Sequence, residues 1–216
     1  MSDWSQLSLG RKAGYAFAAL SLVLVFIAFT TPYWLASDPR IYSAQLLRLG
    51  LWEACFRSFS NPNDLNMEKF YVGCRWVLTY EYNTLRDFIE TPFFVAVQVF
   101  FTIGFTVLLL ACVVLLAMHI CLPAARAFQM LKVVIALLIA SAIPLFLSVA
   151  VFGGMCFERS WLQNPIYNHL SWAYALAVVA FFFHTVAAMM LLGETLKARE
   201  RRRRANNLIY NMQPRS

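Results

Sequence analysis

Long runs of apolar residues alternate with short charged segments along the chain. A helix needs roughly 20 apolar residues to cross a bilayer core of ~30 Å. Four windows of at least that length contain no charged residue: 13–37, 92–125, 133–157 and 160–193. The pattern therefore predicts four membrane-spanning helices, at residues 13–32, 91–121, 130–157 and 172–196.

The composition agrees with this interpretation. Of the 216 residues, 61% are hydrophobic and only 13% are charged, whereas roughly 25% are charged in a typical soluble domain. The alternative is that the windows are buried helices of a soluble protein. A globule of 216 residues is too small to bury four such helices, so the sequence indicates an integral membrane protein.

The basic residues are unevenly divided between the two sides of the predicted membrane. The side that holds both termini carries eleven basic and three acidic residues, and the opposite side carries seven basic and eight acidic residues. Because Lys and Arg accumulate on the cytoplasmic side of membrane proteins, we expect segments 1–12, 122–129 and 197–216 to be cytoplasmic. The net charge of +7 then reflects topology, and no nucleic-acid partner is expected.

Residues 33–90 and 158–171, the first and second outer segments, are expected outside the cell. The first is too long for a simple connector. Its runs Arg48–Phe56 and Phe70–Tyr82 are rich in β-branched and aromatic residues, and Asn61-Pro62-Asn63-Asp64 between them favours a turn. The first outer segment is therefore predicted to form a small antiparallel sheet.

The cysteines follow this topology. Cys55 and Cys74 are the only pair in the first outer segment, and an oxidising compartment favours a disulfide between them; two free buried thiols are the alternative. The bridge would close a loop of 18 residues and stabilise the fold by about 3 kcal/mol. Cys121 at the inner membrane face is a candidate for S-palmitoylation, although a free thiol is the favoured state. Cys156 is assigned no partner.

Trp34, Gly50-Leu51-Trp52, Cys55 and Cys74 follow one another as W…GLW…C…C in the first outer segment. In a four-span chain this order resembles the signature of the claudin superfamily, which also includes peripheral myelin protein, epithelial membrane proteins and channel gamma subunits. The two cysteines are further apart than in vertebrate claudins. This spacing and the run 93–101 at the start of the second helix are most similar to insect claudin-like proteins of the septate junction.

The resemblance implies a four-helix membrane bundle with a small extracellular antiparallel β-sheet. Four strands would come from the first outer segment and one from the second. In the family, the Trp and Gly-Leu-Trp residues anchor this sheet on the bundle, a role that carries over to Trp34, Gly50, Leu51 and Trp52. The family's Arg at the start of the second helix maps onto Arg86, although the surrounding sequence differs there.

The function implied by the resemblance is structural. Relatives assemble within one membrane and across the gap between epithelial cells to form or regulate a paracellular barrier of the septate- or tight-junction type. The expected partners are the protein itself, other claudin-like proteins, further junction proteins and membrane lipids, at lateral contacts of the plasma membrane. The alternative is an auxiliary gamma-type subunit that modulates an ion channel or receptor. A weaker alternative is a membrane-compaction or trafficking protein of the myelin type.

Arg75 follows the second cysteine of the motif directly. In pore-forming claudins this position often faces the pore, and a charge there would exclude ions of like sign. If the protein forms a pore, Arg75 is expected to disfavour cations. The favoured alternative is that Arg75 pairs with Glu53 or Glu68 on a solvated face, because the first outer segment is nearly neutral.

Trp161, Ile166 and Tyr167 lie on the short second outer segment. Exposed aromatic and apolar side chains on such a loop favour contact with another molecule across the gap. Anchoring of the loop in lipid headgroups is an equally good interpretation.

A cluster of basic residues follows the fourth predicted helix and is expected to bind anionic inner-leaflet lipids: Arg201, Arg202, Arg203 and Arg204. The chain contains no HExxH, GxSxG or Walker motif, and its three histidines are scattered. The centres of the apolar windows hold no acidic residue of the kind that transporters use. We therefore expect neither an enzyme nor a site for a metal or cofactor.

Overall fold

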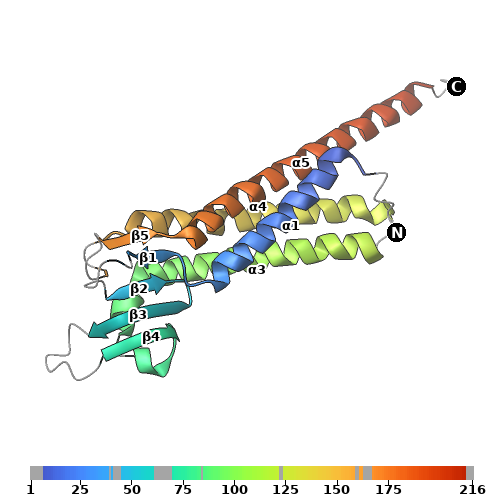
Figure 1. Cartoon of the computed structure of the whole chain (residues 1–216). Helices are drawn as coiled ribbons and strands as arrows, with labels where there is room; N and C mark the ends of the chain where they lie inside the picture. Colours follow the sequence, from blue (N-terminus) through green and yellow to red (C-terminus); the bar gives the residue numbers. More distant parts are fainter. Residues whose placement is uncertain are drawn as a thin grey trace.

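The computed structural model describes residues 7–38, 40, 45–60, 70–83, 85–121, 124–158, 161–162 and 167–212. Figure 1 shows long helices lying side by side with a small sheet at one end of the bundle. The elements follow one another in this order: α1 (Leu9–Thr30), β1 (Leu35–Ser37), β2 (Leu46–Leu49), β3 (Glu53–Ser60), β4 (Phe70–Trp76), the 3-10 helix η2 (Tyr80–Tyr82), α2 (Arg86–Ile89), α3 (Pro92–Cys121), α4 (Ala124–Met155), β5 (Asn168–Leu170) and α5 (Trp172–Met212).

Local sequence explains where the first long helix begins and ends. Ser8 caps α1, with its side chain accepting a hydrogen bond from the backbone N–H of Arg11. The last hydrogen bond of the helix runs from the N–H of Thr31 to the carbonyl of Ile27. Pro32 follows directly and has no N–H with which to continue the ladder. The chain therefore leaves α1 in an extended conformation and enters the sheet.

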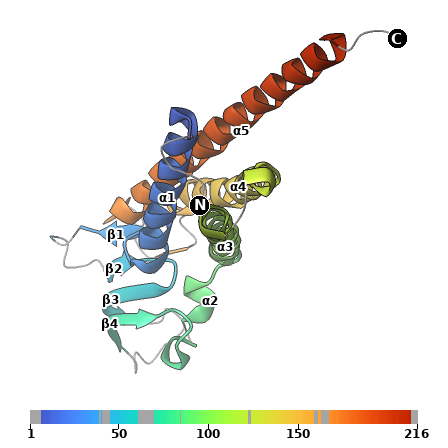
Figure 2. The same ribbon diagram turned by 90° about the vertical axis from the view of Figure 1, so that its right-hand side faces the viewer.

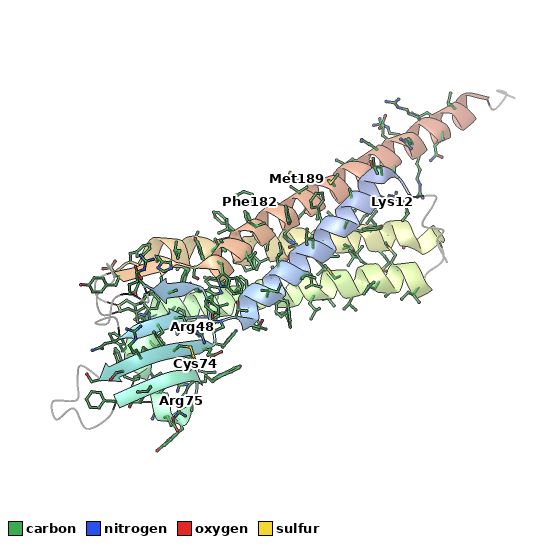
Figure 3. All side chains as sticks on the ribbon, viewed as in Figure 1. Lys12, Arg48, Cys74, Arg75, Phe182 and Met189 are labelled. Carbon is green, nitrogen blue, oxygen red and sulfur yellow. A yellow bond between two sulfur atoms is a disulfide. The ribbon has the colours of Figure 1, made fainter. Side chains whose placement is uncertain are left out.

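The helices α1, α3, α4 and α5 each contain a stretch that is long and apolar enough to cross a membrane, with mean hydropathy between 2.1 and 2.8. Their outward faces carry large apolar side chains that are more than half exposed, such as Phe26, Leu116, Ile143, Phe182 and Met189. The last two project from α5 in Figure 3. Exposed apolar surface on this scale fits a bundle whose solvent is lipid.

Small residues and interhelical hydrogen bonds bring the helices together, as expected where lipid provides no hydrophobic drive for association. A Cβ on Gly104 of α3 would lie 2.6 Å from Cγ of Leu145 on α4, so the two helices approach closely there. The Ser21 hydroxyl of α1 donates to the carbonyl of Ala180 on α5 at 3.1 Å. The Ser148 hydroxyl of α4 donates to the carbonyl of Val97 on α3 at 3.2 Å.

The sheet has five antiparallel strands in the order β4-β3-β2-β1-β5. The first outer segment supplies β1 to β4. The second supplies β5, which pairs beside β1 with Leu35 opposite Leu170. Figure 2 shows the sheet extending away from the helices, with β4 at the far edge and α2 beside β3 and β4. The predicted fold class of a four-helix bundle with a small antiparallel sheet is confirmed.

Several details differ from the sequence predictions. The run Arg48–Phe56 is not one strand, because Gly50, Leu51 and Trp52 turn the chain between β2 and β3. Residues 124–129, expected in an inner loop, belong to α4, and α5 continues through the basic cluster to Met212. The predicted turn at Asn61–Asp64 lies outside the described residues.

Candidate functional site

Trp34 lies where α1 gives way to β1, and its side chain is completely buried. Its indole Nε1–H donates to the carbonyl of Ala28 at 2.7 Å, within the last turns of α1. Phe101 of α3 and Phe152 of α4 contact the ring edge-to-face, with centroids 5.2 and 5.0 Å away. Tyr174 of α5 also meets the ring edge-to-face at 5.8 Å, so one side chain contacts all four long helices, with its only polar atom satisfied.

The Gly50-Leu51-Trp52 turn lies against the same end of the bundle. A Cβ on Gly50 would lie 2.5 Å from the Cα of Pro32, which only glycine avoids. The carbonyl of Leu51 accepts a hydrogen bond of 2.6 Å from the Gln98 side chain of α3. The Trp52 ring meets Phe29 of α1 edge-to-face at 5.5 Å. Every residue of the turn therefore contacts the helices or the linker after α1, although the anchoring role itself stays a prediction.

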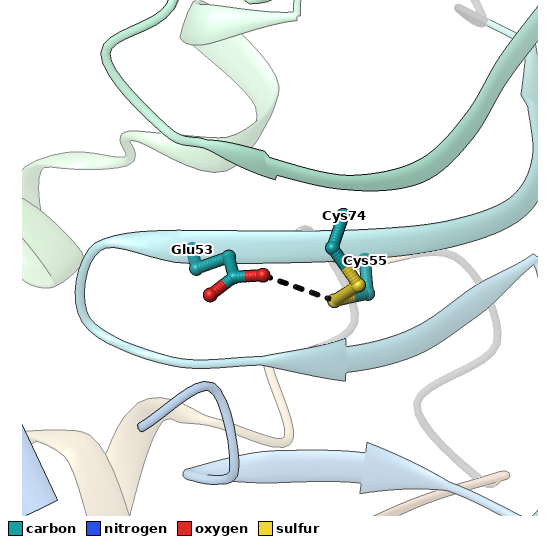
Figure 4. A group of neighbouring side chains, drawn as sticks. All are labelled: Glu53, Cys55 and Cys74. Atoms are coloured by element: carbon teal, nitrogen blue, oxygen red, sulfur yellow. Dashed lines mark hydrogen bonds between the residues drawn. A yellow bond between two sulfur atoms is a disulfide. The ribbon is translucent and has the colours of Figure 1, made fainter. Parts of the chain in front are cut away.

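Cys55 and Cys74 form a disulfide with an S–S distance of 2.06 Å. They lie directly opposite each other on β3 and β4. Figure 4 shows the bridge on the same face as Glu53. Carboxylate oxygen Oε1 of Glu53 lies 3.9 Å from the sulfur of Cys55, but a disulfide sulfur has no proton to donate. Although these three residues cluster tightly, the bonded sulfurs offer no thiolate to a metal ion.

Arg48 of β2 covers the disulfide. Its Nε lies 3.2 Å from the sulfur of Cys55, and its Nη2 lies 3.4 Å from the sulfur of Cys74. Its Nη1 donates to the hydroxyl of Tyr33, whose ring also lies beneath the guanidinium carbon at 4.9 Å. These contacts link the bridge to the segment after α1. Sequence reasoning did not single out Arg48. Arg48 is identified by its position opposite Cys55 in the pairing of β2 with β3, which only the fold shows.

Arg75 does not pair with Glu53, one of the two acids predicted for it. Its Nη1 lies 2.6 Å from Oε2 of Glu81, with about half of each side chain exposed. Successive side chains of a strand point to opposite faces. Glu53, which lies opposite Trp76, is on the disulfide face, whereas Arg75, opposite Ala54, is on the other. Glu68 lies outside the described residues.

Trp161 does not have the exposure expected of a trans contact. Only 2% of its surface is exposed, and its indole N–H donates to the carbonyl of Ile89 at 3.2 Å. The ring packs edge-to-face on Phe93 at the start of α3, with centroids 4.7 Å apart. The prediction was wrong because the protein itself supplies an apolar pocket for the ring. Tyr167 is half-buried, and Ile166 lies outside the described residues.

The remaining predicted positions lie elsewhere in the fold. Arg86 of α2 forms an ion pair with Glu90, with Nε 2.9 Å from Oε2. Cys121 ends α3, and its side chain is outside the described residues. Cys156 is buried, and its thiol is free. The four consecutive arginines, 201–204, are exposed on α5.

Sequence reasoning missed one surface, which we call the β4 stripe: Phe70, Val72 and Trp76. These side chains are 59%, 61% and 55% exposed and alternate along β4 on the face of the disulfide. Figure 3 shows side chains projecting from this strand at the free edge of the sheet. The alternation is visible in the sequence, but alternation alone does not say which face of a strand is covered. The intervening Gly73 has φ of 90°, a conformation that favours glycine.

A comparison with protein-family models agrees with the observed four-helix fold and its small sheet. A family model described as "PMP-22/EMP/MP20/Claudin tight junction" matches residues 19–193. The match runs from α1 to α5 and includes the tryptophan, the Gly-Leu-Trp turn and both bridged cysteines. No curated protein matches the chain.

Proposed function

Because the chain belongs to the PMP-22/EMP/MP20/claudin family, we propose that it is a cell-junction protein that forms or regulates a paracellular barrier. It is a multi-pass membrane protein with four helices able to span the bilayer. Family membership points to a structural rather than an enzymatic role. In the proposed assembly, copies of the chain or claudin-like relatives meet side by side in one membrane and across the gap between epithelial cells.

The proposed orientation places the sheet outside the cell and both termini in the cytoplasm. It rests on the excess of Lys and Arg on the side of the termini. An epitope at the N-terminus should be accessible to antibody only after the cells are permeabilised. Staining of intact cells would reverse the orientation and remove the sheet from the intercellular gap.

The observation that carries the barrier proposal is the β4 stripe. Three large apolar side chains are more than half exposed on the edge strand of the sheet. Edge strands of stable monomers are usually shortened, charged or covered, because an open edge pairs with other chains. A contiguous apolar patch on such an edge marks an interaction surface. The stripe lies on the part of the sheet farthest from the bundle (Figure 2), where a neighbouring chain has access.

The charge on the sheet supports a barrier rather than an ion-selective pore. Arg75 is neutralised by Glu81 at 2.6 Å, so it presents little net charge to passing ions. A dilution potential across an epithelium that carries Arg75→Asp tests this interpretation. We expect little change in relative sodium permeability; a clear increase would favour a pore in which Arg75 repels cations.

The test of the barrier proposal compares Val72→Asp on the stripe with Tyr80→Asp on η2. Both residues are exposed, by 61% and 89%, and both variants add one acid to the same sheet region. In polarised epithelial cells depleted of the native protein, we expect the wild type and Tyr80→Asp to concentrate at lateral contacts and restrict dextran leak. Val72→Asp should reach the surface but fail to restore the barrier.

A different result in these cells would favour the alternative function, an auxiliary subunit of a channel or receptor. Uniform surface distribution of the wild type, with no leak after its depletion, would contradict the barrier role. A change in channel or receptor currents in the same depleted cells would then support an auxiliary subunit. Within the family, we further propose a septate-junction type, supported by the long segment between Cys55 and Cys74.

A further inference from the structure

A second polar site lies at the end of the bundle opposite the sheet, where the first turn of α1 meets α5 (Figure 1). A pocket of about 270 Å³ opens between the two helices. It is lined by Ser8, Arg11, Glu194, Lys197, Ala198 and Arg201. We call this the basic pocket.

Contacts between the two helices hold the basic pocket together. The Ser8 hydroxyl donates to Oε2 of Glu194 at 2.6 Å. Oε1 of the same carboxylate lies 3.6 Å from Nζ of Lys197. A Cβ on Gly10 would lie 2.7 Å from this carboxylate, so glycine at that position leaves room for it. Glu194 is thus positioned from both helices, and it in turn positions Lys197 at the rim.

The charge in the basic pocket is only partly balanced. Three cationic side chains from two helices line it, against one carboxylate. Within the part of the chain that the structure describes, neither Arg11 nor Arg201 forms an ion pair. The beginning of the 22-residue helix α1 adds a partial positive charge. A ligand with about two negative charges would complete the balance.

The depth of the basic pocket points to a lipid. The charge-free window 13–37 begins at this level, directly after Arg11 and Lys12, and the window 160–193 ends there, directly before Glu194. Lipid phosphates lie where the apolar part of a membrane-spanning helix ends. Lys12, the neighbour of Arg11, lies at the same end of α1 (Figure 3). The pocket therefore opens at the headgroup layer, not in bulk solvent.

We propose that the basic pocket binds the headgroup of an inner-leaflet phospholipid that carries a phosphomonoester, of the phosphorylated inositol class. A phosphomonoester carries roughly −1.5 to −2 charges, which matches the charge left in the pocket. A lipid with only a phosphodiester carries less charge and leaves one cation unbalanced. Arginine and lysine at a helix interface suit such headgroups. The choice of leaflet rests on the proposed cytoplasmic termini; the site does not depend on the barrier function.

The test uses full-length protein in detergent, with bound lipids counted by native mass spectrometry. Phosphatidylinositol 4-phosphate, phosphatidylserine and phosphatidylcholine are titrated in parallel. The pocket variant is Arg11→Gln with Arg201→Gln. The matched control, Arg199→Gln with Arg203→Gln, removes the same charge from exposed positions of α5 outside the pocket.

We expect the wild type to prefer the inositol phosphate lipid. The pocket variant should bind that lipid roughly thirtyfold more weakly, from the loss of two charge contacts. The control variant should lose at most a few fold. Equal losses in both variants would show a diffuse electrostatic surface and overturn the proposal, as would equal wild-type affinity for phosphatidylserine. Matching thermal midpoints of the two variants confirm that both are folded.

Two further measurements test the charge match and distinguish a lipid from a soluble ligand. Glu194→Gln raises the charge of the basic pocket by one, so both anionic lipids should bind more tightly, and the more highly charged phosphomonoester lipid should gain more than phosphatidylserine. Unchanged selectivity would contradict the charge match. Soluble inositol 1,4-bisphosphate should displace the bound lipid only in large excess, because it lacks the acyl chains that keep a lipid in the detergent micelle beside the protein. Competition at equal concentration would identify a soluble ligand and overturn the lipid assignment.

Discussion

Trp34 and Trp76 belong to the same sheet region but have opposite surroundings. Trp34 is fully buried among the four long helices, and its indole N–H donates to the carbonyl of Ala28. Trp76 is 55% exposed on the edge strand and stacks on Trp52, with ring centroids 6.0 Å apart. The half of the sheet near the bundle is therefore fixed by packing, and the far half presents its aromatic residues outward.

This difference separates residues that hold the fold from residues free to meet a partner. Near the bundle, the tight approach at Gly50, the hydrogen bond from Gln98 and the buried ring of Trp161 leave little room for substitution. On β4, the exposed face carries Phe70 and Val72, whose replacement removes little buried area. Substitutions near the bundle should therefore reduce stability, and substitutions on the β4 stripe should reduce assembly.

The sharpest test replaces each tryptophan by alanine. Trp34→Ala should lower the free energy of unfolding by about 3–5 kcal/mol, because it leaves a large cavity between the helices. Trp76→Ala should lower it by about 1 kcal/mol or less, since the ring is already half in solvent. Thermal unfolding of both variants in detergent micelles provides the comparison. Similar losses of stability would show that the two halves of the sheet are not distinct.

The disulfide joins the fixed half to the edge, and its removal should have the next largest effect. The double variant Cys55→Ser, Cys74→Ser should lose about 3 kcal/mol, because the unfolded chain is no longer constrained by the closed loop. Reductant should lower the thermal midpoint of the wild type and leave that of the double variant unchanged. A wild-type midpoint that does not respond to reductant, with both thiols shown to be free, would contradict the predicted contribution.

Glycine at the turn provides a smaller and more local test. Gly50→Ala places a methyl group 2.5 Å from the Cα of Pro32, and relief of that clash should cost about 1–3 kcal/mol. Gly154→Ala near the end of α4 is the matched control, because its methyl group meets nothing within 4 Å and alanine favours a helix. The control should be neutral or slightly stabilising in the same unfolding assay. A neutral Gly50→Ala would mean that the turn does not need its close contact with Pro32.

The charge-free windows were sufficient to predict four long helices, because a membrane span requires a continuous apolar stretch. They were not sufficient to predict where those helices end. Residues 124–129 and 197–212 are helical although they carry most of the basic residues near the helix ends. Alanine and arginine are strong helix formers, so a helix continues past the membrane boundary until a breaker stops it.

At the candidate site too, some features could be predicted from the sequence and others could not. The disulfide was predicted because only two cysteines share the first outer segment, and the structure contains it. The pairing of Arg75 with Glu53 was predicted incorrectly, because Glu53 is close to Arg75 in the strand pairing but faces the other side of the sheet. The exposure of Trp161 was also predicted incorrectly, because α3, which is distant in sequence, supplies Phe93 and Phe94 to its pocket beside Phe152 of α4. Contacts of this kind depend on the arrangement of elements, not on local pattern.

The smallest expected effect concerns Tyr82, on the covered face of the sheet. Only 1% of its surface is exposed, and its hydroxyl donates to the carbonyl of Ala54 at 3.4 Å. Burial raises the pKa of Tyr82 to about 12 from an ordinary value of 10.0. The unfolded chain then loses this proton first, so stability should fall as the pH rises from about 10 to 12.

Tyr82→Phe should remove the part of the alkaline destabilisation that comes from the ionisation of Tyr82. At pH ~8 it should lower the free energy of unfolding by at most about 1 kcal/mol, because the lost hydrogen bond is long. The measurement is the fall in thermal midpoint between pH ~8 and pH ~11, which should be smaller in Tyr82→Phe than in the wild type. Tyr80→Phe is the control, since Tyr80 is 89% exposed and should keep the full wild-type fall. An identical fall in all three proteins would mean that the covered face of the sheet is open to solvent, and that the contrast between its two faces is weaker than the packing indicates.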